Sequence, residues 1–327
     1  MKKQDLRIVF MGTPEFAVQS LKLLVDGGYN VVAVVTQPDK PVGRHGSTLQ
    51  APAVKQYALS KSIPVLQPER MKDEEFLAQL RAFNAHLQVV VAFRMLPKQV
   101  WDMPAFGTFN VHAALLPQYR GAAPINWAVI NGETETGVTT FFLDENIDTG
   151  RIIDYKRLAI PDDANVEWVY DHLMRLGAEL CIETVDRILQ QDGKLETTQQ
   201  PEDQPLKHAP KIFKETCQID WNLPVKRIYD FIRGLSPYPG AWTEIAKNDE
   251  QENNKPQVLK IYSANKTQMP AKANPGTFVV EANRLYICTA DNLLELQEIQ
   301  MAGKKRMSSR DFLNGTREAN SFHAISR

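Results

Sequence analysis

The sequence predicts an α/β fold in which a doubly wound parallel sheet is followed by a small antiparallel barrel. Three observations support this prediction. Apolar runs of strand length alternate with helical patterns over residues 7–190, a polar segment with prolines covers residues 192–210, and short strand-like runs separated by turns follow it. Fully apolar strands that alternate with helices are typical of a parallel sheet covered on both faces.

The N-terminal half opens with a strand, a turn and a helix. Arg7–Met11 is a continuous apolar run that ends at Gly12, and apolar residues at helical spacing continue from there to Gly27, where a C-cap glycine is expected. Val31–Val35 is the next strand, rich in β-branched residues. The alternation continues with a strand at Ile63–Leu66, a helix near Asp73–Phe83, a strand at Leu87–Ala92, a strand pair at Val138–Phe142 and Arg151–Tyr155, and a long amphipathic helix at Val166–Gln190.

The pattern changes at the polar segment 192–210, which we interpret as a linker. A helix is expected over Val225–Arg233. Five short strand candidates follow it, at Trp242–Ala246, Val258–Ser263, Thr277–Val280, Leu285–Thr289 and Leu294–Ile299, and turn-rich stretches such as 247–255 and 269–275 separate them. This spacing is typical of a small antiparallel barrel or sandwich. We expect a five-stranded barrel of the OB type, and such barrels often bind nucleic acid.

Length and charge narrow the class of protein further. A chain of 327 residues is long enough for two domains, at about 150 residues each. The net charge is only −1, which argues against a polybasic protein, but it is unevenly distributed. Residues 205–327 carry 18 basic and 13 acidic side chains, a net charge of +5, whereas residues 1–204 carry 20 and 26, a net charge of −6. The basic C-terminal part suggests contact with a polyanion.

Cysteine usage and hydropathy argue against secretion and membrane insertion. Cys181, Cys217 and Cys288 are widely spaced, and the sequence contains no CxxC motif, so neither a zinc site nor a disulfide framework is expected. The N-terminal apolar run breaks at Thr13-Pro14, too early for a signal peptide, and no apolar stretch approaches the roughly 18 residues of a membrane span. We therefore expect a soluble, cytoplasmic protein without a metal, and a monomer.

Common nucleotide-binding motifs are missing. The first strand–helix turn reads Gly12-Thr13-Pro14-Glu15-Phe16-Ala17, which lacks the second glycine of the dinucleotide fingerprint and has a glutamate near the helix N-terminus. The sequence contains neither GxxxxGK[ST] nor GxSxG. NAD binding, P-loop chemistry and an esterase-type nucleophile are therefore not expected.

The segment 109–121 (FNVHAALLPQYRG) is the best candidate for a catalytic site. Asn110 and His112 are two residues apart after an apolar lead-in, so in a strand both side chains point to one face, at the carboxyl end where ligands bind in open α/β sheets. Asp148 follows a later strand. An Asn that stabilises an oxyanion, a His that moves a proton and an Asp that orients the imidazole would suit acyl-type transfer to an amine. No Ser or Cys nucleophile adjoins the His, which favours direct transfer. The same three residues also fit structural roles in a strand end and a turn.

Five sequence blocks in this order resemble the 10-formyltetrahydrofolate-dependent formyltransferases. They are Asn110-Val111-His112, Leu115-Leu116-Pro117, Arg120–Pro124, Glu135–Thr139 and Asp148-Thr149-Gly150. Further blocks over nearly the whole chain resemble the branch of this family that formylates initiator tRNA, among them Gly12–Ala17, Gln37–Pro41, Pro52–Lys55, Ala209–Ile212, Ile219–Trp221, Ile232–Leu235, Pro237–Ala241 and Gly303–Met307.

The resemblance implies a Rossmann-like catalytic domain over residues 1–191, a linker over 192–210 and an OB-like tRNA-binding domain over 211–327. It implies transfer of a formyl group from 10-formyltetrahydrofolate to the α-amine of methionine on initiator methionyl-tRNA, with Asn110, His112 and Asp148 as the catalytic trio. The implied folate contacts are Ala114, Leu115, Leu116, Pro117, Phe93, Arg94, Met95, Leu96 and Asp144. The candidate tRNA contacts are Arg44, Lys211, Lys304, Lys305 and Arg306.

This sequence departs from the family pattern at three places. Ala114 replaces the usual Ser before Leu-Leu-Pro, Phe93-Arg94 replaces Tyr-Gly in the folate loop, and the 43–48 loop, which contains Arg44, has lost lysines that usually meet the acceptor stem.

Two other activities are compatible with the same trio: formyl transfer to an amino-sugar nucleotide and hydrolysis of formyl-folate. A non-catalytic RNA-binding protein is a third alternative, which the intact trio disfavours.

Overall fold

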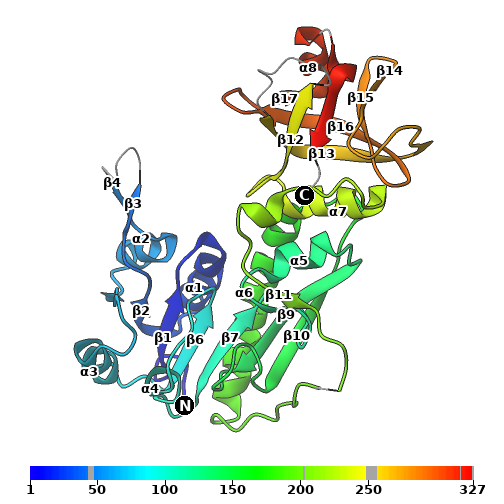
Figure 1. The fold of residues 1–327 in the computed structure, drawn as a ribbon. Helices are drawn as coiled ribbons and strands as arrows, with labels where there is room; N and C mark the ends of the chain where they lie inside the picture. Colours follow the sequence, from blue (N-terminus) through cyan, green and yellow to red (C-terminus); the bar gives the residue numbers. More distant parts are fainter. Residues whose placement is uncertain (43–47, 202, 248–255, 317, 326–327) are drawn as a thin grey trace. The chain divides into compact units, whose positions relative to one another are not determined.

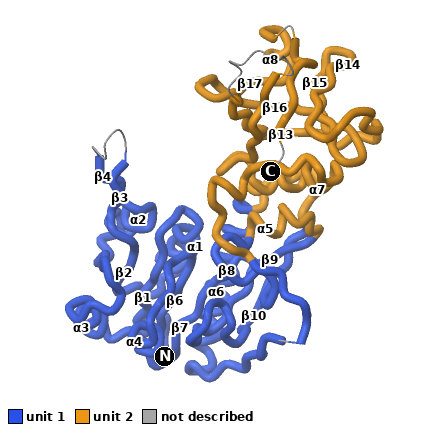
Figure 2. The backbone as a smooth tube through the Cα atoms, viewed as in Figure 1, with its two compact units in different colours: residues 1–124, 135–159, 170–208 blue, residues 125–134, 160–169, 209–327 orange. Residues whose placement is uncertain are grey.

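A computed structural model describes the chain except residues 43–47, 202, 248–255, 317 and 326–327. It divides the chain into two compact units (Figure 2). Unit 1 consists of residues 1–124, 135–159 and 170–208, and unit 2 consists of residues 125–134, 160–169 and 209–327. Two short segments of the N-terminal half, 125–134 and 160–169, therefore belong to the same compact unit as the C-terminal half.

A seven-stranded sheet in the order β10-β9-β7-β6-β1-β2-β5 forms the centre of unit 1 (Figure 1). Strands β7, β6, β1, β2 and β5 run parallel, whereas β9 is antiparallel to both β7 and β10. The predicted parallel sheet is thus confirmed at its centre, and the predicted strand pair is an antiparallel edge. The bounds are β1 Arg7–Gly12, β2 Asn30–Val35, β5 Val65–Leu66, β6 Leu87–Val91, β7 Thr108–His112, β9 Glu135–Phe142 and β10 Ile152–Ala159.

Helices follow the strands as the alternating pattern predicts. Their bounds are α1 Glu15–Asp26, α2 Ala53–Ser60, α3 Glu74–Ala82, α4 Lys98–Trp101, α5 Pro124–Ile130 and α6 Val166–Gln190. Asp73 begins α3 by accepting hydrogen bonds from the backbone N–H groups of Glu75 and Phe76, as an N-cap does. Val9 and Met11 are alternate residues of β1, so they point to one face of the sheet, where they belong to the same buried cluster as three apolar residues of α3.

Two small β-ribbons lie outside the two large sheets. Strands β3 (Lys40–Val42) and β4 (Thr48–Gln50) pair antiparallel on either side of residues 43–47. Strand β8 (Arg120–Gly121) pairs with β11 (His208–Ala209), which lies at the end of the predicted linker. Residues 197–200 are also structured, because the backbones of Ile152 and Thr198 exchange two hydrogen bonds of 2.8 Å. Much of the segment expected as a free linker is therefore packed against unit 1.

An antiparallel sheet in the order β14-β15-β16-β13-β12-β18 forms unit 2, with β17 paired to β16. Residues Thr277 and His323 form a bridge between the chain just before β14 and strand β18, so the two ends of the sheet meet and the sheet curls, as the prediction of a small barrel requires. The bounds are β12 Ala241–Lys247, β13 Gln257–Pro270, β14 Phe278–Glu281, β15 Arg284–Cys288, β16 Asn292–Met301, β17 Met307–Ser308, β18 Phe322–Ile325, α7 Val225–Leu235 and α8 Ser309–Gly315.

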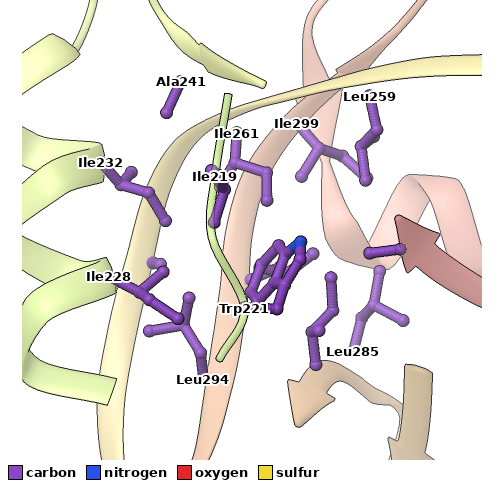
Figure 3. Close-up of a cluster of buried hydrophobic side chains, with 14 of the residues drawn as sticks. Ile219, Trp221, Ile228, Ile232, Ala241, Leu259, Ile261, Leu285, Leu294 and Ile299 are labelled. Carbon is purple, nitrogen blue, oxygen red and sulfur yellow. The ribbon is translucent and has the colours of Figure 1, made fainter. Parts of the chain in front are cut away.

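Trp221 lies at the centre of the unit 2 core (Figure 3). Its ring is completely buried, and its indole N–H donates a 3.1 Å hydrogen bond to the Thr243 hydroxyl, so the one polar atom of the side chain is satisfied. Ile228 and Ile232 reach this cluster from α7, where their i, i+4 spacing places them on one face. All five strand candidates are confirmed, but β13 continues through Pro270, into a stretch expected to be a turn.

Candidate active site

Asn110 and His112 lie on β7, at the carboxyl end of a strand in the middle of the unit 1 sheet. Their alternate positions place both side chains on one face of the sheet, as predicted. The Asn110 side chain is half-buried, and among the described residues none hydrogen-bonds to its amide. That amide is therefore free to bind a substrate atom.

His112 is held in a buried, oriented position. Its side chain is only 6% exposed, and its ring stands edge-on to Phe141 with the centroids 6.4 Å apart. The Nε2 atom lies 2.9 Å from the backbone carbonyl oxygen of Tyr119. A carbonyl oxygen can only accept, so Nε2 carries a proton and donates it. In the neutral ring, Nδ1 therefore has the lone pair and is the atom that can take up a proton.

Asp148 lies beside this free nitrogen. Its Oδ2 atom is 3.8 Å from His112 Nδ1, and the same oxygen accepts a 2.9 Å hydrogen bond from the Gly121 backbone N–H. The 3.8 Å separation is longer than a hydrogen bond but short enough for a strong electrostatic interaction once the ring is protonated. The structure thus brings His112 and Asp148 together in the way that acid–base chemistry needs.

The loop that carries Asp148 has a constrained backbone. Asp148 has a φ of 55°, in the left-handed region that Asp and Asn tolerate better than most residues. A Cβ atom at position 150 would lie 1.7 Å from the backbone oxygen of Phe142, so only glycine fits there. These two requirements explain why the loop has Asp148 and Gly150 at these positions.

Gln200, from the predicted linker, completes the support of this loop. Its side-chain N–H groups donate to the carbonyl oxygens of Asp148 and Gly150, at 2.9 and 2.7 Å. Its Oε1 atom accepts from Nε and Nη2 of Arg120, at 3.0 and 2.7 Å. The Gln200 side chain is buried and fully engaged. Sequence reasoning missed this residue, because nothing in a polar segment marks one glutamine as packed against a site 52 residues earlier.

The block Ala114–Pro117 forms the loop after β7. Thr139 on β9 fixes it, because its hydroxyl donates to the Ala114 carbonyl at 2.7 Å and accepts from the Leu116 N–H at 3.2 Å. Ala114, Leu116 and Pro117 are buried, and Leu115 is half-buried. The Ala114 side chain lies inside unit 1 and is not exposed at its surface.

The other predicted folate residues follow β6 and β9. Met95 is 68% exposed, Phe93 is half-buried and Leu96 is buried. The Arg94 guanidinium donates to the carbonyl oxygens of Pro68 and Glu69, and burial lowers its pKa from the ordinary value. Two of its nitrogens are therefore occupied by backbone carbonyl oxygens. Asp144 is exposed, and its Oδ1 accepts from the Asn146 N–H and the Thr149 hydroxyl.

The predicted tRNA contacts, apart from Arg44, lie in unit 2. Lys211, Lys304, Lys305 and Arg306 are exposed in unit 2, the last three in the turn between β16 and β17. The Lys211 ammonium lies 5.4 Å from the centre of the Phe213 ring. Arg44 lies outside the described residues.

No group of three or more His, Cys, Asp or Glu residues in the described part of the chain could hold a metal ion. None of the described helices is both long enough and apolar enough to span a bilayer.

Both parts of the chain match known protein families. The formyl transferase family model matches residues 6–185, and the model of the formyl transferase C-terminal domain matches residues 211–317. A methionyl-tRNA formyltransferase of Parabacteroides distasonis is 61% identical over 97% of this chain and 98% of the relative. One of Bacteroides fragilis is 57% identical over 96% of each chain.

Solved structures with the same fold are much more distant in sequence. The sugar 3N-formyltransferase WlaRD has a TM-score of 0.62 at 18% identity, covering 92% of this chain and 99% of WlaRD. HypX from Aquifex aeolicus, in complex with tetrahydrofolic acid, has a TM-score of 0.59 at 18% identity, covering 94% of this chain and 46% of HypX. Together with the family models and the close relatives, the His112–Asp148 arrangement in the first of two matched domains leads to one conclusion: the chain belongs to the formyl transferase family.

Proposed function

We propose that this protein transfers a formyl group from 10-formyltetrahydrofolate to the α-amine of methionine on initiator methionyl-tRNA, in the cytoplasm. The relatives that match along nearly their whole length are methionyl-tRNA formyltransferases. The observation that supports the chemistry is the 3.8 Å distance between His112 Nδ1 and Asp148 Oδ2. His112 lies on the strand that also carries the unengaged Asn110 amide.

In the proposed reaction, the amine nitrogen forms a bond to the formyl carbon, and the bond between that carbon and the folate nitrogen breaks. His112 Nδ1 accepts the proton that the attacking amine loses and returns it to the departing folate nitrogen. Acid–base help of this kind contributes about 10²–10⁴-fold to the rate. The fixed Nε2 donation to Tyr119 leaves Nδ1 as the only ring atom able to carry this proton.

Asn110 and Asp148 stabilise the charges that develop. The Asn110 amide N–H donates to the formyl oxygen as it becomes an oxyanion, which is typically worth about 10²–10³-fold. Asp148 stabilises the protonated imidazole. Gln200 acts as a positioning residue, because it holds the backbone of the Asp148 loop without contacting the reacting atoms.

The folate is proposed to lie against the loops 93–96 and 114–117 and near Asp144. The uncommitted Asn110 amide and the exposed Met95 side chain are compatible with a ligand there. The tRNA is proposed to contact Lys211, Lys304, Lys305 and Arg306, whose exposed charges suit a phosphate backbone.

A direct assay tests this proposal. The purified chain is incubated with 10-formyltetrahydrofolate and methionyl initiator tRNA, and formyl-methionine is measured after deacylation. In parallel, the tRNA is replaced by an amino-sugar nucleotide or omitted. We expect product only with tRNA. Product only with the sugar nucleotide, or release of formate without any acceptor, would replace the proposal with one of the two alternative activities.

A further inference from the structure

A cavity of about 450 Å³ lies entirely within unit 2, away from the proposed catalytic trio in sequence. Three parts of the chain line it: residues in 161–168, which lead into α6, residues of α7 and its C-terminal end, and residues 262–264 of β13 with Glu298 of β16 and Arg306 of the turn that follows. This volume is within the range of pockets that hold small organic ligands. The catalytic steps proposed above do not use it, although Arg306 of its lining is also a proposed tRNA contact.

A buried arginine lines the cavity from α7. Arg233 is only 6% exposed, and its Nε atom pairs with Asp230 at 2.8 Å while Nη1 donates to the Ala164 carbonyl at 2.8 Å. Its Nη2 atom has no hydrogen-bond partner among the described residues. A guanidinium held rigidly by its other nitrogens is well suited to bind an anion such as phosphate.

Ser236, at the end of the same helix, adds a second unused polar group. The residue is only 2% exposed, it lines the cavity, and no described residue hydrogen-bonds to its hydroxyl. Its oxygen is not sealed from solvent, so a ligand in the cavity can hydrogen-bond to it in place of water.

Another part of the lining offers a flat stacking surface. The Arg306 guanidinium lies 4.2 Å from the centre of the Tyr262 ring, and the Tyr262 hydroxyl is fixed by Gln300 at 2.7 Å. Glu298, which also lines the cavity, pairs with Arg306 at 2.6 Å, so its charge is balanced. Planes of Arg and aromatic side chains are the surfaces on which unpaired bases stack.

We propose that this cavity binds a nucleoside phosphate, with the phosphate at Arg233 Nη2 and the Ser236 hydroxyl and the base against the Arg306–Tyr262 stack. Two sources can supply this chemistry: an unpaired nucleotide of a bound tRNA, or a free nucleotide. The first source rests on the proposed function, and the second does not.

Calorimetric titration of the full chain tests the site without any formyl transfer. AMP is the probe, and adenosine and inorganic phosphate are titrated separately. We expect saturable binding of AMP at one site, with adenosine and phosphate each bound at least about tenfold more weakly, because each retains only one half of the contacts. No saturable heat with AMP, or phosphate bound as tightly as AMP, would overturn the proposal.

Three variants locate the binding. Arg306→Gln removes the stacking cation and should weaken AMP binding about tenfold, and Ser236→Ala should weaken it about threefold. The matched control is Arg284→Gln, since Arg284 also pairs with a glutamate of β16, at 3.4 Å from Glu295, but does not line the cavity. Its binding should equal that of the wild type. Arg233 is left intact, because its removal would leave Oδ1 of the buried Asp230 without its partner, although Lys226 would still pair with Oδ2. Thermal unfolding checks that each variant is folded, and folded variants with unchanged AMP binding would contradict the assignment.

A competition experiment separates the two sources. If initiator tRNA displaces AMP in proportion to its own binding, the cavity accepts a nucleotide of the RNA. If AMP stays bound in the tRNA complex, the cavity accepts a free nucleotide. Because AMP binding is measured alone, a chain that failed to formylate tRNA would still test this site.

Discussion

The surroundings of His112 in unit 1 and the basic turn 304–306 in unit 2 show two different ways of using polar side chains. His112 is buried, and each of its ring nitrogens faces one defined atom, the Tyr119 carbonyl oxygen or the Asp148 carboxylate. Lys304 and Lys305 are exposed, and neither ammonium group has a partner among the described residues. The first region fixes a few atoms in place, and the second presents exposed, unpaired charges.

This difference matches the two tasks of the proposed reaction. Proton transfer requires an oriented base within hydrogen-bond reach of its substrate, so one misplaced side chain costs much of the rate. Attraction of a polyanion depends on the sum of many charges, so each one contributes little and salt screens it. We therefore expect single substitutions in the first region to affect turnover strongly, and substitutions in the second to affect binding weakly.

The largest expected effect is that of His112→Ala. It removes the base that Tyr119 and Asp148 orient, so kcat should fall by about 10²–10⁴-fold while the sheet remains folded. Steady-state formylation and circular dichroism check this prediction. His208→Ala is the matched control, because it removes an exposed imidazole from the end of the linker and should leave kcat unchanged. Near-normal turnover of His112→Ala would remove this residue from the mechanism.

Asp148→Asn should have the next largest effect. Asn tolerates the φ of 55° and can still accept from the Gly121 N–H, so the loop should keep its shape. Only the charge is lost, and kcat should fall by about 10²-fold because the protonated imidazole is no longer stabilised. Glu145→Gln removes an exposed acid of the same loop and is the control. Equal activity of the two variants would show that the Asp148 charge is not used.

Gln200→Ala tests whether the loop support matters. It leaves two carbonyl oxygens and the Arg120 guanidinium without their partner, so the free energy of unfolding should fall by about 1–3 kcal/mol. Displacement of the Asp148 loop should lower kcat by about tenfold, with little change in KM for tRNA. Gln199→Ala, which removes an exposed acceptor of Arg151, is the control in urea unfolding and kinetics. Lower stability with unchanged kcat would limit Gln200 to a structural role.

The smallest effect per residue is expected in unit 2. The double variant Lys304→Ala, Lys305→Ala should weaken tRNA binding and reduce the slope of log K against log salt by about 2, because two phosphate contacts are lost. Filter binding at several salt concentrations measures the slope. Lys272→Ala is the control for loss of an exposed lysine from the same unit. If the slope of the double variant equals that of the wild type, these lysines do not contact tRNA.

Much of the fold and of the candidate site could be predicted from local sequence patterns. Helix α6 has the bounds expected from its periodicity, and the i, i+2 spacing placed Asn110 and His112 on one face of a strand. Both predictions depend on residues close together in the chain, where backbone geometry alone decides which side chains share a face.

What could not be predicted depends on contacts between distant residues. Gln200 supports the Asp148 loop through hydrogen bonds to its backbone, for which a glutamine in a polar segment gives no signal. The segment 160–169 packs with α7 because Arg233 donates to the Ala164 carbonyl and Tyr229 to that of Asp162. Neither pairing has a periodicity or motif that a single sequence displays.

One measurement tests the division between the two regions most directly: the single-turnover rate of formylation as a function of enzyme concentration, for His112→Ala and for Lys304→Ala, Lys305→Ala. We predict that the double variant reaches the wild-type rate at saturation but needs more enzyme to saturate the tRNA, whereas His112→Ala saturates normally at a rate lower by at least about 10²-fold. A wild-type limiting rate for His112→Ala, or a reduced limiting rate for the double variant, would contradict this account.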